Sequence, residues 1–486
     1  MIEKEKLSKI VGARNISVDP ATLEGYSRDM SFVNPIRPDC VVKPTKAEDV
    51  GKIVKLANET RTPLVPVSSG APHFRGDTVP SAGGAVVVDL SQMNKVIFVD
   101  RPRRVCMVEP GVTFGELIPQ VKKEGLRLNM PLLPRKTKSV VGSILEREPV
   151  LMPKYQWDIS DPLACTEVFF GTGDEFRTGQ AAGPGTVKEQ WKVGGLQKAP
   201  YGPGTASWHR LIQGAQGTMG IVTWASMRCE ILPSIEEPFV VGSADLGTLL
   251  DMASWLIRLR MVNECFILND TNLATIFAGR PEDYQKLKDT LPPWTLFYTV
   301  AGYEYLPEER VESYVKDITD LTQRLGVSAA KAAGVLSANE ILKTIQLPSR
   351  EPYWKLCKGA CQDVFFLTIH DKVKGHIAAM QTMAEKAGYL TADLGMYIQP
   401  VVQGTSYHCE FNLFYDPASS KERGRVQGLS NQATKNLMAT GAFFSRPYGE
   451  SAGTILNRDA ATVAVLGKLK SIVDPNNIMN PGKICF

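Results

Sequence analysis

The sequence predicts an α+β protein built from two or three packed units. The chain has 486 residues, and a domain holds roughly 100–200 residues. Hydrophobic residues make up 43% and charged residues 22%, which is typical of a globular protein that buries a large core. Helical stretches and short apolar strands are mixed along the chain, and this mixture predicts the α+β class.

In the first half, residues 47–60 predict a helix, because four apolar side chains recur at helical spacing. They are Val50, Ile53, Val54 and Ala57. A short strand at 62–67 follows, and then a loop at 68–84 that is rich in Gly, Ser and Pro. Two strands are predicted within 85–100, joined by a turn at Gln92–Asn94. After them come a strand at 104–112 and a helix at 114–124. No GxGxxG motif lies between a strand and a helix, so the ordinary dinucleotide fingerprint is absent.

In the second half, a boundary is predicted near Pro233, and a helix-covered sheet follows. The predicted helices are 246–260, 307–325 and 371–387, and the predicted strands are 295–301, 363–369 and 407–414. From about residue 441 a Gly/Pro loop leads to a final helix at 460–473.

Composition and charge argue against several classes of partner and site. The net charge of +4 is small and no basic run stands out, so nucleic acid is not expected as a partner. No run of about 18 apolar residues and no secretory signal occurs, so neither a transmembrane segment nor secretion is expected. The nine cysteines include no CxxC pair. We therefore expect a reduced, cytoplasmic protein without a metal or iron–sulfur site.

Four stretches of the sequence resemble a known family when they are taken together and in order. They are SSGAPHFRGDTVP (68–80) with VVVDLSQMNKV (86–96); VEPGVTFGEL (108–117); EVFFGTGDEFRTG (167–179) with YGPG (201–204) and QGAQGTMGIVT (213–223); and VDPNNIMNPGKI (473–484). With these stretches the chain resembles the vanillyl-alcohol oxidase/p-cresol methylhydroxylase superfamily of flavoproteins. The resemblance implies a PCMH-type FAD-binding domain made of residues 1–232 and 441–486. It also implies a cap domain, 233–440, that carries an antiparallel sheet and binds the substrate.

The resemblance also implies FAD as the cofactor and places its contacts in the small-residue loops. A diphosphate needs backbone N–H groups that can approach it closely, and small residues allow this. The main-chain groups of Ile221 and Val222 are expected at the edge of the flavin ring. The full set of expected cofactor residues is Val67, Ser68, Ser69, Gly70, Ala71, Pro72, His73, Pro110, Ser139, Gly142, Ser143, Asp161, Gly214, Gly217, Gly220, Ile221, Val222, Arg446, Asn480 and Lys483.

The sequence departs from the family pattern in two of these loops. Pro72 and His73 stiffen the first loop, where the family has more glycine. Some members bond FAD covalently to a histidine of this loop, but the spacing of His73 does not match. After Gly142 and Ser143, the segment ILEREPVLM (144–152) replaces the usual Asn- and Gly-rich continuation.

The resemblance leaves two branches of the superfamily open, and they imply different substrates. The D-2-hydroxy acid branch carries histidine- and acid-rich segments, of which His408 and Glu410 remain within YIQPVVQGTSYHCEF (397–411). The alkylphenol branch, which fits better, holds a phenolate with two tyrosines and an arginine. The arginine is retained as Arg446, whereas Arg75 and Ser445 stand where the tyrosines would be and Tyr448 lies two residues further on.

We therefore expect an FAD-dependent dehydrogenase or oxidase that takes a hydride from a small hydroxylated substrate. The expected catalytic residues are Arg446, His408, Arg75, Tyr448 and Glu410. A fixed cation favours the ionised form of the substrate oxygen, and histidine is the natural base near neutral pH. Structural roles stay open: a salt bridge or flavin contact for Arg446, a solvated position for Arg75, and a core position for His408.

The electron acceptor is expected to be oxygen, a cytochrome, a quinone or an iron–sulfur or other electron-transfer protein. Three further readings stay open: a D-2-hydroxy acid dehydrogenase resembling the glycolate oxidase flavin subunit, a flavin subunit of a larger electron-transfer complex, and a flavoprotein fold without activity. A homo- or hetero-oligomer is expected.

Overall fold

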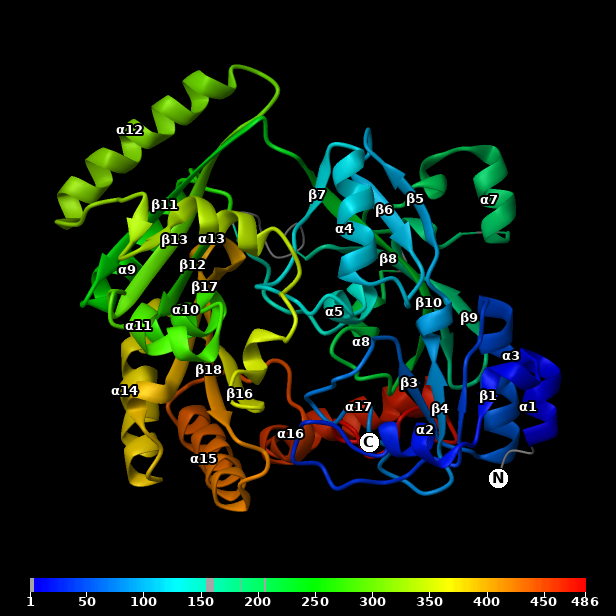
Figure 1. The fold of residues 1–486 in the computed structure, drawn as a ribbon. Coiled ribbons are helices and arrows are strands. Elements are labelled where there is room, and N and C mark those ends of the chain that lie inside the picture. Colours follow the sequence, from blue (N-terminus) through cyan, green and yellow to red (C-terminus); the bar gives the residue numbers. More distant parts are fainter. Residues whose placement is uncertain (1–3, 154–160, 184, 205–206) are drawn as a thin grey trace.

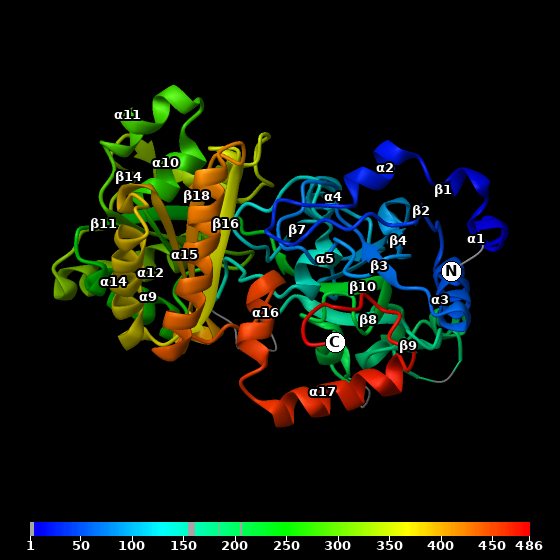
Figure 2. The same cartoon turned by 90° about the horizontal axis from the view of Figure 1, so that it is seen from below.

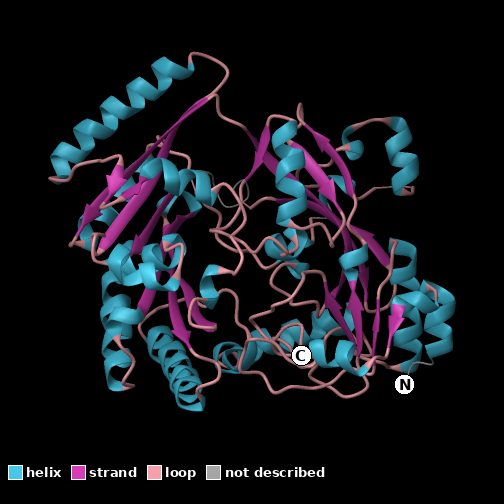
Figure 3. Ribbon diagram, viewed as in Figure 1, coloured by secondary structure: helices cyan, strands magenta, loops and turns pink. Residues whose placement is uncertain are grey.

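The computed structural model describes residues 4–153, 161–183, 185–204 and 207–486. The chain forms two lobes that stand side by side, with the green-to-orange middle of the chain in one lobe and most of the remainder in the other (Figure 1). Each lobe has β-sheet at its centre and helices around it (Figure 3). The predicted α+β class is confirmed by three main sheets, one largely parallel and two antiparallel.

The first sheet has the strand order β1-β2-β4-β3 and is parallel except for its edge strand β1. Helix α3 covers this sheet over the residues predicted for it, and the four apolar residues predicted for one face are all buried. The elements are α1 (Lys4–Val11), β1 (Ile16–Ser17), α2 (Pro20–Gly25), β2 (Cys40–Val42), α3 (Ala47–Thr60), β3 (Leu64–Val67) and β4 (Val86–Asp89).

The second sheet is antiparallel and is organised around its long strand β10 (Gly220–Ile231). Its other strands are β5 (Val96–Asp100), β6 (Val105–Val108), β7 (Leu126–Leu128), β8 (Leu163–Phe170) and β9 (Glu175–Arg177). Helices α4 (Phe114–Lys123) and α5 (Val140–Leu145) pack on this sheet. Helices α7 (Val187–Val193) and α8 (His209–Ile212) lie in the connection from β9 to β10.

The two strands predicted within 85–100 exist, but they belong to different sheets. A short 3₁₀ turn, η2 (Leu90–Gln92), separates them, and the Asp89 carboxylate caps this turn by accepting a bond from the Ser91 N–H at 2.9 Å. Met93 is fully buried behind the turn and its carbonyl accepts from Gly111. The segment therefore carries the chain from the first sheet to the second.

The third sheet lies in the other lobe, is antiparallel, and has the order β11-β13-β12-β17-β18-β16. Its strands are β11 (Ile235–Ser243), β12 (Cys265–Asn269), β13 (Trp294–Gly302), β16 (Ala360–Thr368), β17 (Leu394–Val401) and β18 (Ser406–Tyr415). Helices α9 (Leu246–Arg258), α12 (Pro307–Leu325), α14 (His370–Lys386) and α15 (Ser420–Ala439) cover one face. The other face carries α10 (Asp270–Phe277), α11 (Tyr284–Lys288), α13 (Ala338–Ile345), the turn η6 (Trp354–Leu356) and the small pair β14 (Ala332–Ala333) and β15 (Leu336–Ser337).

The alternation of side chains along β18 directs polar residues toward the first lobe. Tyr407, Cys409 and Phe411 belong to the core beneath the four helices. Because successive side chains of a strand point to opposite faces, His408 and Glu410 lie on the other face. This register places polar residues of the third sheet at the boundary between the lobes.

The C-terminal segment returns to the first sheet after α16 (Gly449–Leu456), which lies at the boundary between the lobes, and α17 (Ala460–Val473), which runs along one edge of the first lobe (Figure 2). The N–H of Leu64 donates to the Ile478 carbonyl at 2.7 Å, and the Asn480 N–H donates to the Leu64 carbonyl at 2.8 Å. The division into an FAD-binding unit, 1–232 with 441–486, and a cap, 233–440, is kept as a proposal that this contact supports.

No helix within the described part of the chain is long and apolar enough to cross a membrane.

A buried ion pair holds the returning segment, and its removal should destabilise the fold. Asp474 is 1% exposed and accepts bonds from Lys470, from the Ile478 N–H and from the Met479 N–H. Asp474→Ala should lower the free energy of unfolding by about 3 kcal/mol, since it leaves the Lys470 ammonium buried without its partner. Urea denaturation followed by circular dichroism measures this loss. The exposed Lys468→Ala in the same helix serves as the control, and equal stability of the two variants would contradict the assignment.

Candidate functional site

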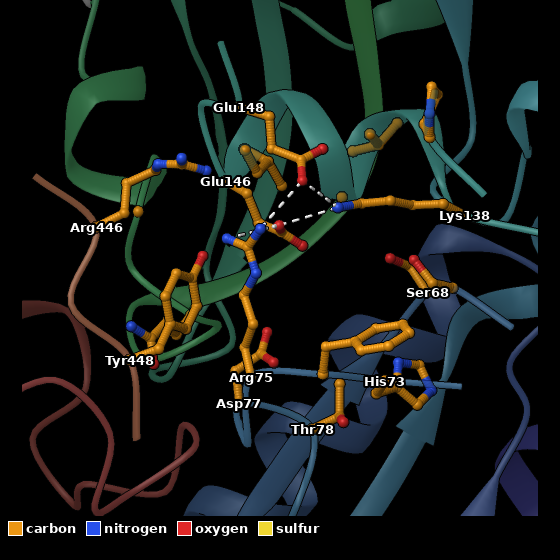
Figure 4. A pocket seen from close by; sticks show the side chains of 18 of the residues that line it. Ser68, His73, Arg75, Asp77, Thr78, Lys138, Glu146, Glu148, Arg446 and Tyr448 are labelled. Atoms are coloured by element: carbon orange, nitrogen blue, oxygen red, sulfur yellow. Dashed lines mark hydrogen bonds and ion pairs between the residues drawn. The ribbon is translucent and has the colours of Figure 1, made fainter. Parts of the chain in front are cut away.

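A cavity of about 210 Å³ lies between the lobes and takes its walls from both. The first lobe contributes the loop after β3, helix α5 and the start of β10; the second contributes η6, β16, β17 and β18. Ser68 and His73 lie at one side of this pocket and Arg446 and Tyr448 at the other, with Arg75 between them (Figure 4). The cavity therefore joins the small-residue loops to the predicted catalytic residues.

Most of the predicted cofactor residues line this cavity. They are Val67, Ser68, Ser69, His73, Pro110, Gly142, Gly214, Gly217, Gly220, Ile221, Val222 and Arg446. Of the predicted catalytic residues, Arg75, Arg446, Tyr448 and Glu410 line it as well. His408 instead lines a smaller neighbouring cavity that shares Arg446 and Glu148 with the first.

The remaining predicted cofactor residues lie outside the lining of this cavity, and several of them hold its loops. They are Gly70, Ala71, Pro72, Ser139, Ser143, Asp161, Asn480 and Lys483. The Ser139 hydroxyl donates to the Pro110 carbonyl at 2.6 Å and accepts from the Gly142 N–H, so it anchors the start of α5. Their roles toward the cofactor stay predictions.

Asn480 and Asp161 are two of the predicted cofactor residues that lie outside the lining of the cavity. The Asn480 amide donates to the carbonyls of Asp77 and Gln216, at 2.8 and 2.7 Å, and so ties the first loop to the loop before β10. The Asp161 carboxylate accepts from Arg210 and Gln213, both at 2.9 Å.

Two glycines in the loop before β10 allow a close approach of backbone segments. Gly217 has φ +72°, and a Cβ atom there would lie 2.4 Å from a ring carbon of Pro66. A Cβ at Gly220 would lie 2.6 Å from the Phe169 carbonyl oxygen. Any side chain would therefore push the loop away from Pro66 or Phe169 and reshape the cavity wall.

Arg75 lies in a charged cluster that the sequence did not reveal. Its guanidinium is 3.3 Å from the Glu148 carboxylate and 3.6 Å from that of Glu146, and Lys138 lies 2.9 Å from Glu148 (Figure 4). Burial alone would raise the pKa of Glu148, but Lys138 and Arg75 outweigh it and lower that pKa to about 2. The one signal in the sequence was the pair of carboxylates in ILEREP, where the family resemblance led us to expect Asn and Gly.

Arg446 lies in a different electrostatic environment from Arg75. It is 7% exposed, and its guanidinium carbon lies 4.3 Å from the centre of the Phe365 ring. Its Nη1 has no hydrogen-bond partner, and no ion pair of this residue occurs in the described part of the chain. Burial and the nearby Arg75 lower the pKa of Arg446. The site thus holds a desolvated cation without a counter-ion.

His408 and Glu410 meet on the face of β18 that points to the first lobe. The His408 Nε2 is 3.3 Å from the Glu410 carboxylate. Two residues absent from our sequence-based prediction, Lys355 and Asp363, complete this wall. Lys355 follows Tyr353 and Trp354, and a charge within this aromatic stretch is the only local signal of its place.

Known proteins similar to this chain include a subunit of 4-cresol dehydrogenase and D-lactate dehydrogenases. Residues 38–174 match the family model described as FAD binding domain. The chain is 24% identical to the flavoprotein subunit of 4-cresol dehydrogenase [hydroxylating] from Pseudomonas putida, over 99% of this chain and 94% of that protein. It is 23% identical to the mitochondrial D-lactate dehydrogenase [cytochrome] of Arabidopsis thaliana, over 92% and 74%. The crystal structure of p-cresol methylhydroxylase with substrate bound superposes with a TM-score of 0.85 at 22% identity and covers 99% of this chain and 96% of that one.

The residues present fit FAD. A dinucleotide diphosphate needs a wall of small residues, and Ser68, Ser69 and Gly142 provide one within a single cavity. Burial lowers the pKa of His73 to about 4, so this loop residue is neutral near pH 7. Gly217 and Gly220 bring the loop before β10 against Pro66 and Phe169. We expect these segments to hold the diphosphate, while Ile221 and Val222 offer main-chain groups to the ring edge.

The cradle can be tested at Gly142, where a Cβ would lie 3.2 Å from the Ser68 hydroxyl. Gly142→Val should weaken FAD binding by about tenfold or more, since overpacking of such a gap costs about 1–3 kcal/mol. Flavin fluorescence titration of the apoprotein measures the dissociation constant. The control is Gly375→Val, in the exposed face of α14, where a Cβ meets nothing within 4 Å. An unchanged affinity in Gly142→Val would place the diphosphate elsewhere.

The matched FAD-binding model, the relatives over nearly the full chain and the shared fold agree with one another. The cavity supplies the small-residue walls and the polar groups that such a cofactor requires. The chain is therefore an FAD-dependent oxidoreductase that shares the fold of p-cresol methylhydroxylase and is similar in sequence to the 4-cresol dehydrogenase flavoprotein subunit over nearly its full length.

Proposed function

We propose that this protein takes a hydride from a small hydroxylated organic substrate, phenolic or otherwise anionic, to N5 of FAD. The observation that carries the proposal is the buried guanidinium of Arg446, which has no counter-ion in the described part of the chain. Burying a charge without a partner is costly. Such a group is retained where it meets an anion during function.

Arg446 fits this role better than Arg75. The charge of Arg75 is already balanced by Glu146 and Glu148, and its guanidinium lies against the rings of Phe365 and Tyr448 at 4.8 and 5.0 Å. Arg75 therefore serves as part of the wall that excludes water from the anion site. Arg446 is left to stabilise the negative charge of the substrate.

The surroundings of Arg446 favour a planar aromatic substrate. Phe365 lies under its guanidinium, and Tyr353, Trp354, Tyr397 and Tyr448 line the same cavity. Aromatic side chains in a cavity wall can stack on the aromatic ring of a substrate. The relatedness to a 4-cresol dehydrogenase subunit and to p-cresol methylhydroxylase supports the same substrate class.

The chemistry follows from these residues. Bound FAD supplies the acceptor for the hydride. Loss of a hydride leaves positive charge on the substrate carbon, and an ionised oxygen on the substrate stabilises that charge. Arg446 favours the ionised oxygen through its own charge. We assign the proton to His408, because burial lowers its pKa and the neutral imidazole can accept a proton.

A second candidate is a D-2-hydroxy acid dehydrogenase, which the relatedness to D-lactate dehydrogenase favours. Here Arg446 would bind the carboxylate through two parallel hydrogen bonds, and His408 would take the hydroxyl proton.

In either case the electrons pass to a further acceptor: oxygen, a cytochrome, a quinone or an iron–sulfur or other electron-transfer protein. The chain would then act alone or as the flavin subunit of a larger complex.

Anaerobic reduction of the bound flavin distinguishes the candidates. The purified holoprotein is mixed with a panel of 4-alkylphenols, aryl alcohols and D-2-hydroxy acids, and loss of flavin absorbance is followed. We expect phenols and aryl alcohols to bleach the flavin fastest. Bleaching by hydroxy acids alone would replace the first candidate with the second, and a holoprotein bleached by none of them would contradict both.

Removal of the Arg446 charge should impair the reaction without loss of the cofactor. Arg446→Ala should lower kcat/KM by about 10²–10³, typical of removing one donor that stabilises a developing oxyanion. Arg446→Lys should recover part of the rate, because lysine keeps the charge but not the fork of donors. Rapid-mixing kinetics of flavin reduction measure the effect, with flavin content determined in parallel.

The matched control is Arg258→Ala, an exposed arginine of helix α9 that stacks on Trp255 at 4.8 Å. Its flavin reduction should match that of the wild type. Unchanged reduction in Arg446→Ala would assign that residue a structural role, and loss of FAD would assign it to the cofactor.

A further inference from the structure

A buried lysine lies in the cavity wall opposite the FAD loops. Lys355 is 8% exposed and extends from η6 between two carboxylates. Its ammonium is 2.6 Å from the Asp363 carboxylate of β16 and also binds the Glu410 carboxylate of β18. Burial alone would lower the pKa of Lys355, but the two carboxylates raise it well above its usual value. Lys355 is therefore a permanent cation that joins two strands of the third sheet.

Asn412 fixes the same two carboxylates from the other side. Its amide nitrogen donates to Oδ1 of Asp363 and to Oε1 of Glu410, both at 2.7 Å. The amide of Asn272 donates to the Asn412 oxygen at 2.8 Å, which sets the orientation of the Asn412 amide. Oε1 of Glu410 is thus occupied by Lys355 and Asn412. Oε2 remains for His408.

This arrangement determines which nitrogen of His408 carries the proton. Burial would raise the pKa of Glu410, but Lys355 and His408 lower it well below its usual range, so the group is a carboxylate that accepts and cannot donate. The neutral imidazole must then donate from Nε2, and Nδ1 keeps its lone pair. Within the described residues Nδ1 has no hydrogen-bond partner.

We propose that Lys355, with Asp363 and Asn412, is a positioning cluster that holds Glu410 as a carboxylate and His408 as its Nε2–H tautomer, so that Nδ1 accepts the proton of the substrate hydroxyl. The inference rests on the proposed function. The hydroxyl proton passes to Nδ1, and the electron pair of the cleaved C–H bond leaves with its hydrogen as the hydride that FAD accepts. Lys355 itself touches neither reacting atom.

The charges of the cluster suit this single proton transfer. Lys355, Asp363 and Glu410 together carry one net negative charge, and the imidazolium formed at His408 brings the group to neutrality. Arg446 and Tyr397 also face His408; the guanidinium disfavours an imidazolium before the substrate anion arrives. Without Lys355, Asp363 and Glu410 would compete for one proton. A protonated Glu410 would donate to Nε2 and reverse the tautomer.

The tautomer is measured directly by ¹⁵N NMR of the holoprotein labelled at the histidine rings, without substrate. The chain has five histidines, and His408→Gln identifies the signals of His408. The wild type should show a protonated Nε2 and an unprotonated Nδ1, favoured by about tenfold or more because a hydrogen bond to a charged acceptor is strong. A neutral Nδ1–H tautomer, or an imidazolium near pH 7, would overturn the proposal.

Three variants test the part played by Lys355. Lys355→Met, which keeps the length without the charge, should give a mixed tautomer that changes with pH. Lys355→Arg should restore the wild-type signals. The control Lys358→Met removes an exposed lysine that pairs with Asp393 at 2.7 Å, and it should change nothing. Wild-type histidine signals in Lys355→Met would overturn the proposal. If Lys355→Met does not fold, Lys355→Arg provides the test, because loss of the Nε2–H tautomer in this folded variant would also overturn the proposal.

Flavin reduction by 4-hydroxybenzyl alcohol provides the functional arm of the same experiment. Lys355→Met should lose about tenfold or more in the rate of reduction, within the range for general base catalysis, with little change in FAD content. The NMR result stands even if this alcohol does not reduce the wild-type flavin. Failure of the proposed function and failure of the cluster are therefore separate outcomes.

Discussion

The structure depends on the neutralisation of charges that are buried between the two lobes. On the first lobe, Arg75 and Lys138 balance Glu146 and Glu148. On the second, one lysine balances two carboxylates. A charge buried without a partner costs several kcal/mol, so each pairing restricts how the lobes can meet. Arg446 has no such partner among the described residues, and we propose that an anion binds there.

The geometry of the site follows from the third sheet and from the chain's return to the first lobe. Alternation along β18 directs His408 and Glu410 away from the helix core, and antiparallel pairing with β16 sets Asp363 beside them. The loop after β18 and α15 then brings Arg446 and Tyr448 to the same cavity. Rigid strands hold the polar residues, whereas loops with small residues form the cofactor side. This division suits a cofactor that needs close backbone contact and a substrate that needs fixed side chains.

The sequence alone determined many of the local elements and indicated the loops that we assign to the cofactor. The helices at 47–60, 307–325 and 460–473 were predicted with the bounds they have, because periodic apolar residues and clear end signals act over a single turn. The small-residue loops were identified through the family resemblance, and a diphosphate needs the close approach that small residues allow. Their contacts with the cofactor stay predictions. Other helix ends differed by one or two residues, where the final turn lacks a distinct signal.

Only the tertiary structure decided which of these pieces meet. The strands at 86–89 and 96–100 belong to different sheets, because pairing is settled by packing and not by the turn between them. The cluster of Lys355, Asp363 and Glu410 joins residues up to 55 positions apart, and no local pattern marks them. The sequence showed that Arg446 and Arg75 were both present. The fold decided that Arg75 is paired and Arg446 is not, because the counter-ions Glu146 and Glu148 come from the segment directly after helix α5, which is distant from both arginines in the chain.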